Sequence, residues 1–563
     1  MHSTMKILHV LATLLPAAWC AGHGHAIHNP IIPGWNPDPA VLRVGDEYFI
    51  ATSSMEYWPG IPIYRSTDLE NWELYSHAFT RPEQLQLYGT PTSAGAWAPS
   101  LSHIDGKFYI TAVTRWTYDP VAKVWPRAFW VSSPDLKNWS DPTWADPWGI
   151  DPDLFQDPVT KKVYLNIMAP NNNVDRIWGI SQCEVDLRNG PCIGEYRSIW
   201  NGTLPHNSTA RPEGPKMFKR GSWYYLLIAE GGTDELHRAT IARSKSAEGP
   251  WEANPNNPLI YNGAYGFTNL TVQSTGHATM FETKGGDWYA VFLARRNING
   301  KSPLGRETFL CTVDWKDDWP VFNNGEPILL NDASEPKPIP SPFMDTFSKS
   351  KLDSSWYQLR TPYTETYSLS RRGGSKGLIL RPNVFSLSER DVPAAVLRKQ
   401  TSLNMTFSAT LLPVKGGSFG PRQTIGISAY LSELQHQDIG LTGCAEQSGL
   451  CVYTTTLNNG TSEHAEYPLN ATKVQGLTFH IRAEPLEYRL GYSLGKSTVT
   501  WLTSFPSSWM AIAPPNWFVF DGAMFSLFAS GNGEPWPMNA PEVGFEKAKE
   551  VYYQEDIPDY DDW

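Results

Sequence analysis

The sequence has no excess of positive charge. Its 563 residues include 46 Lys and Arg against 57 Asp and Glu, which gives a net charge of −11 with neutral His. No cluster of Lys or Arg interrupts this acidic balance. Proteins that bind nucleic acid or an anionic membrane surface need a concentrated basic face. The composition therefore argues against both kinds of partner, and it does not specify an oligomeric state.

Long hydrophobic runs are also missing beyond the first residues. A single Lys precedes an apolar stretch at 7–19, small residues follow it, and the stretch is too short to span a membrane stably. This layout is typical of a secretory signal peptide. We expect residues 1–21 to be this signal and the protein to be secreted into the extracellular space. Cleavage after Cys20, Ala21 or Ala26 fits equally well.

Cysteine is scarce, with six residues in all. Cys183 with Cys192, and Cys444 with Cys451, are close pairs that each bracket a Gly-containing turn. In an oxidising compartment each pair can close a small loop. We therefore predict these two disulfides and a buried thiol at Cys311. No spacing is typical of zinc, and we predict no metal ligands.

Seven Asn-X-Ser/Thr sequons fit a glycosylated secreted protein. They are Asn138, Asn201, Asn207, Asn269, Asn404, Asn459 and Asn470.

The chain is rich in aromatic residues and turn formers, with 24 Trp, 25 Tyr, 46 Pro and 44 Gly. Five segments, 54 to 64 residues apart, share one pattern of an opening polar or special residue, an apolar run, a tight turn and an aromatic-rich strand. Gly turns without a helical period indicate antiparallel sheet, and five such repeats indicate a five-bladed β-propeller. The opening residues are Asp38, Trp97, Asp151, Glu213 and His277.

Alternating prolines divide the chain into two parts. We expect an all-β protein, with the propeller at 27–330, a stiff Pro-rich linker at 331–342 and a β-sandwich at 343–553, where stretches of alternating polarity recur. An acidic tail at 554–563 is expected to fray. Because the linker is short, we expect the sandwich to pack against the propeller.

The innermost strand of a propeller blade follows the central channel, so the five opening residues are predicted to converge at one mouth of it. Three of them are carboxylates, Asp38, Asp151 and Glu213, and each adjoins a proline. Proline restricts the backbone, which suits catalytic groups that need a fixed geometry. Asp beside Pro is also ordinary turn chemistry, but matching positions in three blades favour a site.

The aromatic residues near these carboxylates favour the same interpretation. Trp35, Trp58 and Trp97 lie close to them in sequence, although most Trp side chains simply fill the blades. Carboxyl groups that face one another in an aromatic pocket suit glycoside hydrolysis. One must be protonated to supply a proton to the leaving oxygen, and another must be ionised to activate water. A third carboxylate would raise the pKa of the acid.

Three other carboxylates compete for these roles. Asp153 alternates with Asp151 along the strand and should point the other way. Glu230 lies at the far end of the strand that Glu213 opens. We expect Asp153 and Glu230 to be structural, and Asp157 is the third competitor.

Nine motifs occur in an order that resembles glycoside hydrolase family 43. They are NPDPAVL, WPGIPI, WAPSL, GIDPDLF, PEGP, AEGGT, IARSKS, GHA and PLGRET. This family comprises five-bladed propeller enzymes that act on xylan side chains and xylo-oligosaccharides. The resemblance covers residues 27–330, and the second half resembles the concanavalin A-like β-sandwich often appended to β-xylosidases of the family.

The resemblance implies a role for each candidate residue. Asp38 matches the general base, Glu213 the general acid, and Asp151 the carboxylate that tunes and orients the acid. Arg306 matches an arginine that binds hydroxyls of the terminal sugar, the alternative being an ion pair with Glu307.

The aromatic and imidazole candidates follow from the same resemblance. Trp97 matches an aromatic wall residue, and Trp58 is a further substrate-binding candidate. His277 matches a histidine near the axis that touches a water or a structural calcium ion in some members, with simple packing as the alternative. Met55 stands where an aromatic residue is usual, and Ser100 replaces the usual Asp after WAP, which puts the sugar preference in question.

The implied function is that of an exo-acting, inverting β-D-xylosidase that needs no cofactor. Its substrates would be xylo-oligosaccharides or arabinoxylan, and α-L-arabinofuranosyl groups can share one site with xylosyl groups because their hydroxyl patterns are similar. The alternative is an α-L-arabinofuranosidase that debranches arabinoxylan. Fructan hydrolysis is disfavoured because the motifs of that family are absent. The intact carboxylates disfavour a non-catalytic carbohydrate-binding protein.

Overall fold

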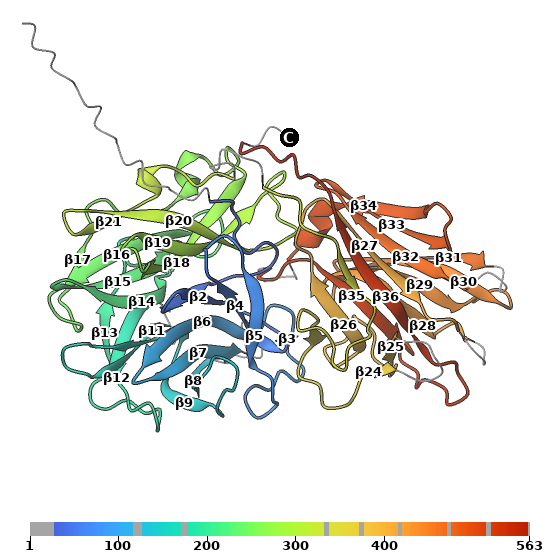
Figure 1. Ribbon diagram of the computed structural model, residues 1–563, viewed down its shortest axis with the longest axis horizontal. Helices are drawn as coiled ribbons and strands as arrows, with labels where there is room; N and C mark the ends of the chain where they lie inside the picture. Colours follow the sequence, from blue (N-terminus) through green and yellow to red (C-terminus); the bar gives the residue numbers. More distant parts are fainter. Residues whose placement is uncertain are drawn as a thin grey trace, which may run out of the picture.

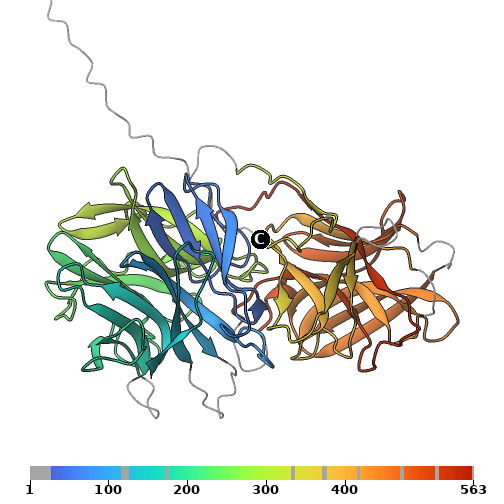
Figure 2. The same ribbon diagram turned by 60° about the horizontal axis from the view of Figure 1, so that its bottom comes forward.

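The computed structural model describes residues 27–115, 126–170, 177–330, 337–370, 377–414, 419–469, 475–513 and 519–560. The expected signal peptide at 1–21, the first half of the expected linker and the sequon at Asn470 lie outside the described residues. Two β-rich halves lie side by side (Figure 1), and the turned view in Figure 2 shows the same division.

The first half is a ring of five antiparallel four-stranded sheets, which confirms the predicted propeller. Blade 1 contains β1 (Ala40–Val44), β2 (Glu47–Ala51), β4 (Gly60–Ser66) and β5 (Glu73–Phe79). Blade 2 contains β6 (Gly95–Ile104), β7 (Lys107–Arg115), β8 (Arg127–Ser133) and β9 (Thr143–Trp148). Blade 3 contains β10 (Ile150–Gln156), β11 (Val163–Pro170), β12 (Trp178–Glu184) and β13 (Arg197–Trp200). Blade 4 contains β14 (Glu213–Arg220), β15 (Trp223–Glu230), β16 (Arg238–Ser244) and β17 (Glu252–Ala253). Blade 5 contains β18 (Val272–Glu282), β19 (Trp288–Arg296), β20 (Glu307–Lys316) and β21 (Trp319–Phe322).

The second half consists of two antiparallel sheets that enclose a large hydrophobic core, which confirms the predicted sandwich. The larger sheet contains β22 (Phe343–Asp345), β24 (Tyr367–Ser370), β25 (Gly377–Leu380), β27 (Met405–Leu411), β32 (Leu477–Ala483), β33 (Glu487–Leu494), β34 (Thr500–Pro506) and β36 (Val543–Tyr552). The smaller sheet contains β26 (Ala394–Lys399), β28 (Thr424–Ser432), β29 (Gln435–Gly443), β30 (Leu450–Asn458), β31 (Thr461–Leu469) and β35 (Met524–Ser530).

Helical structure in the described residues is limited to short 3-10 turns. These are η1 (Asn262–Tyr265), η2 (Asn323–Gly325) and η5 (Ser507–Ala511). None of the helices in the described part of the chain has the length and apolar character needed to cross a membrane.

The N-terminal segment closes the ring between blades 5 and 1. The Asn29 side chain donates to the Leu310 carbonyl and accepts from the Leu310 amide, both at 2.9 Å. Further along the chain, the Asn36 amide donates to the Arg306 carbonyl at 2.9 Å. These bonds fix the start of β20 beside the segment that leads into Asp38.

The two halves are packed against each other, as expected from the short linker. β3 (Tyr57–Trp58), from the propeller, pairs with β23 (Gln358–Leu359), which precedes the sandwich sheets. One hydrophobic cluster contains Trp35 and Trp97 from the propeller together with Tyr430 and Phe528 from the sandwich. Burial of apolar surface across this boundary opposes independent motion of the halves.

Both predicted disulfides are formed. Cys183 and Cys192 have a Cα–Cα distance of 5.7 Å, and Cys444 and Cys451 have one of 5.1 Å. Cys311 is buried and lies outside both bridges.

The acidic tail does not fray over residues 555–559, which corrects the expectation from its composition. The Thr271 amide donates to the Asp559 carbonyl at 2.8 Å, and Ile557 is buried in a small cluster with Ile298 of blade 5. Glu555 accepts hydrogen bonds from Arg296, Ser402 and Leu403. The tail is held because the Glu555 carboxylate pairs with the buried Arg296 guanidinium. Composition does not reveal such a tertiary contact.

We predict that Glu555→Ala lowers the free energy of unfolding by about 2–3 kcal/mol, because it leaves buried donors on Arg296 and Leu403 without an acceptor. Urea unfolding followed by circular dichroism measures the change. Asp556→Ala is the matched control, since this neighbouring carboxylate is exposed. Equal stability of the two variants would contradict the conclusion that Glu555 anchors the tail to the rest of the protein.

Candidate active site

The innermost strand of each blade carries the same β-bulge where it begins. In β6, the advance of three positions from Trp97 to Ser100 is matched by an advance of only two positions in β7, from Val113 to Thr111. The same three-for-two shift recurs between 150 and 153 in β10, 213 and 216 in β14, and 276 and 279 in β18. In blade 1, the bond from Ser53 to Pro37 and the Ala40–Ala51 pair reproduce it. A bulge re-aims side chains, and here it does so five times around one axis.

The second residue of each bulge lies in the left-handed region of φ. These residues are Asp38 (56°), Ala98 (38°), Asp151 (56°), Gly214 (60°) and His277 (51°). The equivalent positions are therefore Ala98 and Gly214 in blades 2 and 4, and the predicted register was off by one residue at Trp97 and Glu213. The proline that follows Asp38, Ala98, Asp151 and Gly214 is the signal that marks the correct register.

The second bulge residues meet at the axis. The Nδ1 atom of His277 lies 3.6 Å from Oδ1 of Asp38. A Cβ atom on Gly214 would lie 2.9 Å from Nε2 of His277, so the imidazole occupies the space that a side chain at position 214 would need. The Gly214 amide in turn donates to Asp151 at 2.9 Å. The structure thus brings Asp38, Asp151 and His277 together, with Glu213 adjoining Gly214.

Asp38 is held as a buried carboxylate. Arg306 donates from Nη1 to its Oδ1 at 2.9 Å, and Ser53 donates to its Oδ2 at 2.6 Å. The Ala98 amide donates to Ser53 Oγ at 2.7 Å, which directs the hydroxyl proton toward Asp38. Burial alone would raise the pKa of Asp38, but Arg306 and the Ser53 hydrogen bond bring it below its ordinary value. Arg306 pairs with Asp38 and not with Glu307, which instead binds Arg296.

Glu213 and Asp151 have the opposite electrostatic character. Burial and the Asp151 charge raise the pKa of Glu213 to about 8. Burial and the Asp38 charge also raise the pKa of Asp151, whereas Lys216 and the Gly214 amide stabilise its ionised form. No hydrogen-bond donor within the described ranges reaches the Glu213 carboxyl. These shifts favour the ionised form of Asp38 and the protonated form of Glu213 near neutral pH.

His277 is neutral near pH 7 because burial lowers its pKa to about 3. The charged groups that act on it are Asp38, Lys216 and Arg306, two cations against one anion. Its Nε2 atom is buried without a hydrogen-bond partner among the described residues, and its ring packs against Gly214. Calcium prefers six to eight oxygen ligands, and a structural calcium ion near the axis stays a prediction.

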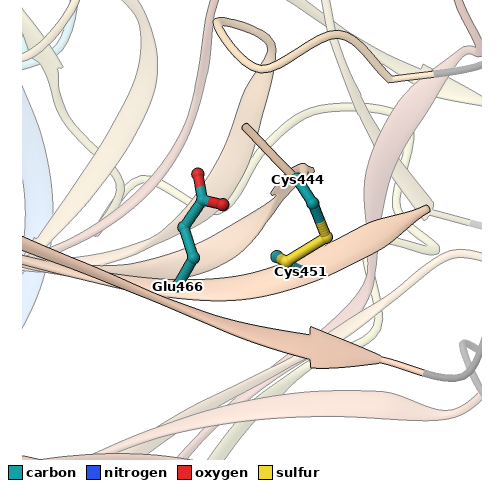
Figure 3. Close-up of side chains that lie close together, drawn as sticks. All are labelled: Cys444, Cys451 and Glu466. Atoms are coloured by element: carbon teal, nitrogen blue, oxygen red, sulfur yellow. A yellow bond between two sulfur atoms is a disulfide. The ribbon is translucent and has the colours of Figure 1, made fainter. Parts of the chain in front are cut away.

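A second place where donor atoms gather is on the sandwich, far along the chain from the carboxylates. Among the described residues, Cys444, Cys451 and Glu466 form the one group of three close His, Cys, Asp or Glu donors. Figure 3 shows that the two sulfur atoms are joined in the disulfide. A cysteine binds a metal ion as a thiolate, and neither sulfur atom is a thiolate in the disulfide. This group is therefore not a metal site.

Trp97 and a residue of the sandwich form the aromatic side of the site. The rings of Trp97 and Phe520 meet edge to face, with centroids 5.8 Å apart, and the Arg306 guanidinium lies 5.2 Å from the Phe520 centroid. The sequence did not reveal Phe520, because it lies more than 200 residues after Arg306 and no motif marks it. Met55 belongs to the same hydrophobic cluster as Trp35 and Trp97.

Trp58 lies elsewhere, which corrects its prediction as a substrate-binding residue. Only 6% exposed, it packs in the hydrophobic cluster of blades 1 and 2 with Phe79 and Leu85. Its strand β3 pairs with β23, so its position serves the contact between the halves.

The competing carboxylates have structural partners. Ser100 donates to Asp153 at 2.6 Å, and the Met217 amide donates to the same carboxylate at 3.1 Å. Glu230 accepts from Thr203 and Thr240, both at 2.7 Å. Asp157 caps the turn that follows β10.

Comparison with known proteins identifies both halves. Residues 27–320 match the family described as glycosyl hydrolases family 43. Residues 344–539 match the β-xylosidase C-terminal concanavalin A-like domain.

Similar proteins align along nearly the whole chain. A non-reducing end α-L-arabinofuranosidase of Bacteroides ovatus is 31% identical, covering 93% of this chain and 96% of its own. A xylan 1,3-β-xylosidase of a Vibrio species is 32% identical, covering 90% and 96%. The crystal structure of a xylan β-1,4-xylosidase from Bacillus halodurans superposes with a TM-score of 0.83 at 29% identity, covering 93% and 99%.

Proposed function

The chain belongs to glycosyl hydrolases family 43 and is a glycoside hydrolase, and on this premise we propose that it removes terminal β-D-xylosyl residues from xylan-derived saccharides with inversion. The observation that carries the proposal is the arrangement of three buried carboxyl groups, in which Asp38 is bound by Arg306 and Ser53 and Asp151 by the Gly214 amide next to Glu213. The lowered pKa of Asp38 and the raised pKa of Glu213 agree with it. General base and general acid catalysis require these two protonation states at the same pH.

In the proposed mechanism, Asp38 takes a proton from water as the water attacks the anomeric carbon. Glu213 gives its proton to the leaving glycosidic oxygen, so the released sugar has the opposite anomeric configuration. Asp151 keeps Glu213 protonated through its charge and does not touch the water. Arg306 holds Asp38 ionised and presents its remaining donors to hydroxyls of the terminal sugar.

Exo action is supported by the contribution of the sandwich to the site. Phe520 packs on Trp97 and beside Arg306, so a second domain covers one side of the site. A polysaccharide chain that ran through the site would have to displace this segment, whereas a chain end would not. We therefore propose Trp97, Phe520 and Arg306 as the surroundings of the terminal sugar.

An arabinofuranosidase activity is the second candidate. The name of the B. ovatus relative supports it, as do two relatives named xylosidase/arabinosidase, although most of the similar proteins are named xylosidases. Met55 belongs to the same hydrophobic cluster as Trp97, and its flexible side chain can adapt to either sugar. We propose arabinoxylan side chains as alternative substrates.

We also propose that the enzyme is secreted and glycosylated. The apolar N-terminal segment and the seven sequons support this. Two disulfides fit an oxidising compartment. The sequons at Asn138, Asn207 and Asn459 lie on exposed turns, where an oligosaccharide meets no steric barrier.

The function is tested by assaying aryl β-D-xylopyranoside and aryl α-L-arabinofuranoside side by side, followed by proton NMR of the first sugar released from a β-xyloside. We expect cleavage of the xyloside and release of the α-anomer. Background rates on both glycosides would refute the proposal. Release of the β-anomer first would mean a covalent intermediate, with Asp38 as the nucleophile.

Substitution of the two catalytic carboxylates should give different patterns. Asp38→Asn should lower kcat by about 10²–10⁴-fold on every substrate, because no base remains. Glu213→Gln should cause a similar loss on xylobiose but spare aryl glycosides with acidic phenols, which depart without protonation. Steady-state kinetics on both substrates measures this. Asp287→Ala, an exposed carboxylate of blade 5, should match the wild type. Equal losses on both substrates for Glu213→Gln would contradict its role as the acid.

Asp151→Asn should move the alkaline limb of kcat/KM to lower pH by about one unit or more. The alkaline limb reports loss of the Glu213 proton, and removal of the neighbouring negative charge lowers the raised pKa of Glu213. The pH profile on xylobiose measures the shift. Asp287→Asn is the control, because this carboxylate of blade 5 is exposed and is not among the charges that act on Glu213. An unchanged alkaline limb in Asp151→Asn would contradict the assignment.

A further inference from the structure

We propose that Ser93 is a positioning residue that fixes Trp97 and Phe520 against each other and thereby sets the affinity of the site for the terminal sugar. This inference rests on the proposed function of the site. Ser93 lies in the segment before β6, contacts residues of both halves and is fully buried. Neither motif nor repeat marks it, and it does not adjoin the carboxylates.

Four hydrogen bonds converge on Ser93. Its carbonyl accepts from the Trp97 indole at 3.0 Å, and its Oγ accepts from the Phe520 amide at 3.1 Å. The hydroxyl donates to Oδ2 of Asp521, and the Ser93 amide donates to Oε2 of Glu56 at 3.0 Å. One residue thus bonds directly to both aromatic residues of the site, one from each half.

The other side of the Phe520 backbone is held by the propeller as well. The Trp35 indole donates to the Phe520 carbonyl at 2.8 Å, and Arg306 reaches the same carbonyl at 3.4 Å. The Phe520 backbone is thus held at both its carbonyl and its amide, and Ser93 Oγ is the acceptor for the amide. Loss of the hydroxyl frees one side of this anchor and lets the Phe520 ring move relative to Trp97.

The backbone of Ser93 permits a test that separates the hydroxyl from the chain geometry. Its φ is 64°, in the left-handed region that favours glycine. Ser93→Gly removes the hydroxyl and relieves the backbone, whereas Ser93→Ala removes the hydroxyl and keeps the strain. A change that both variants share is due to the hydroxyl.

Asp521 provides a second, independent variant pair. Its carboxylate accepts from the Ser93 hydroxyl and orients the lone pair that faces Phe520. Asp521→Asn retains an acceptor oxygen in place, whereas Asp521→Ala removes it. The conservative variant should therefore behave like the wild type where the alanine variant does not.

The matched control is Thr361, whose hydroxyl spans the same boundary between the halves. It donates to the Leu85 carbonyl at 3.0 Å and accepts from the Leu87 amide at 3.1 Å. Thr361→Val removes as many hydrogen bonds across the boundary without any contact to Trp97 or Phe520. It reports the effect of weaker packing between the halves alone.

The test is steady-state kinetics of these variants on aryl β-D-xylopyranoside, with a crystal structure of Ser93→Gly. We expect Ser93→Gly, Ser93→Ala and Asp521→Ala to raise KM about tenfold, while kcat stays within about threefold because the carboxylates are untouched. Asp521→Asn and Thr361→Val should keep the wild-type KM.

Unchanged KM in both Ser93 variants would overturn the proposal, as would an equal rise in Thr361→Val. The crystal structure separates this outcome from failure of the proposed function. If the wild type cleaved neither glycoside, the function would fall, yet a displaced Phe520 ring in Ser93→Gly would still support the positioning role. A Phe520 ring in its wild-type place would refute it.

Discussion

Asp38 has to remain ionised while it is buried beside two other carboxyl groups, and the Arg306 guanidinium is what makes this feasible. Burial opposes the charge on Asp38, and an uncompensated charge in such a place is costly. Arg306 is itself buried, so its position must be fixed from several sides. The Asn36 amide binds its carbonyl, and its side chain bonds to Asp38 and to the Phe520 carbonyl. Arg306 is therefore held both by the segment that closes the ring, through Asn36, and by the sandwich, through Phe520.

The repeated bulge explains how a symmetric fold gives an asymmetric site. Each of the five blades presents one residue with a left-handed φ at the axis, but the side chains of these residues differ. They are Asp38, Ala98, Asp151, Gly214 and His277. Glycine at 214 is needed because His277 fills its side-chain space. Glu213 then extends from the position before it, which gives the acid a direction that differs from that of Asp38 and Asp151. Backbone strain of this kind is typical of functional sites.

The sequence predicted the propeller, the sandwich and the three carboxylates because each leaves a local signature. Repeats show in the turn and strand pattern, and the prolines mark the bulges. The register at Glu213 was missed by one residue, since a polar residue was preferred over the glycine that the bulge requires. Trp58 was misplaced because an aromatic residue near a motif does not reveal which side of the sheet it faces. The contacts of Ser93 with Phe520 and Asp521, and of Arg296 with Glu555, join residues that are hundreds of positions apart. No sequence periodicity encodes such contacts.

The charges around the axis are consistent with the proposed proton location. Asp38, Asp151 and Asp153 supply three negative charges, and Arg306, Lys216 and Arg211 act on the same groups as three cations. With these three carboxylates ionised, a further charge on Glu213 would leave the group with a net charge of −1. Lys216 has no hydrogen-bond partner for Nζ among the described residues, so it acts through its charge, and burial lowers its pKa. Lys216 stabilises the ionised form of Asp151, and an ionised Asp151 keeps the proton on Glu213. The acid is therefore maintained by a buried lysine that need not touch it.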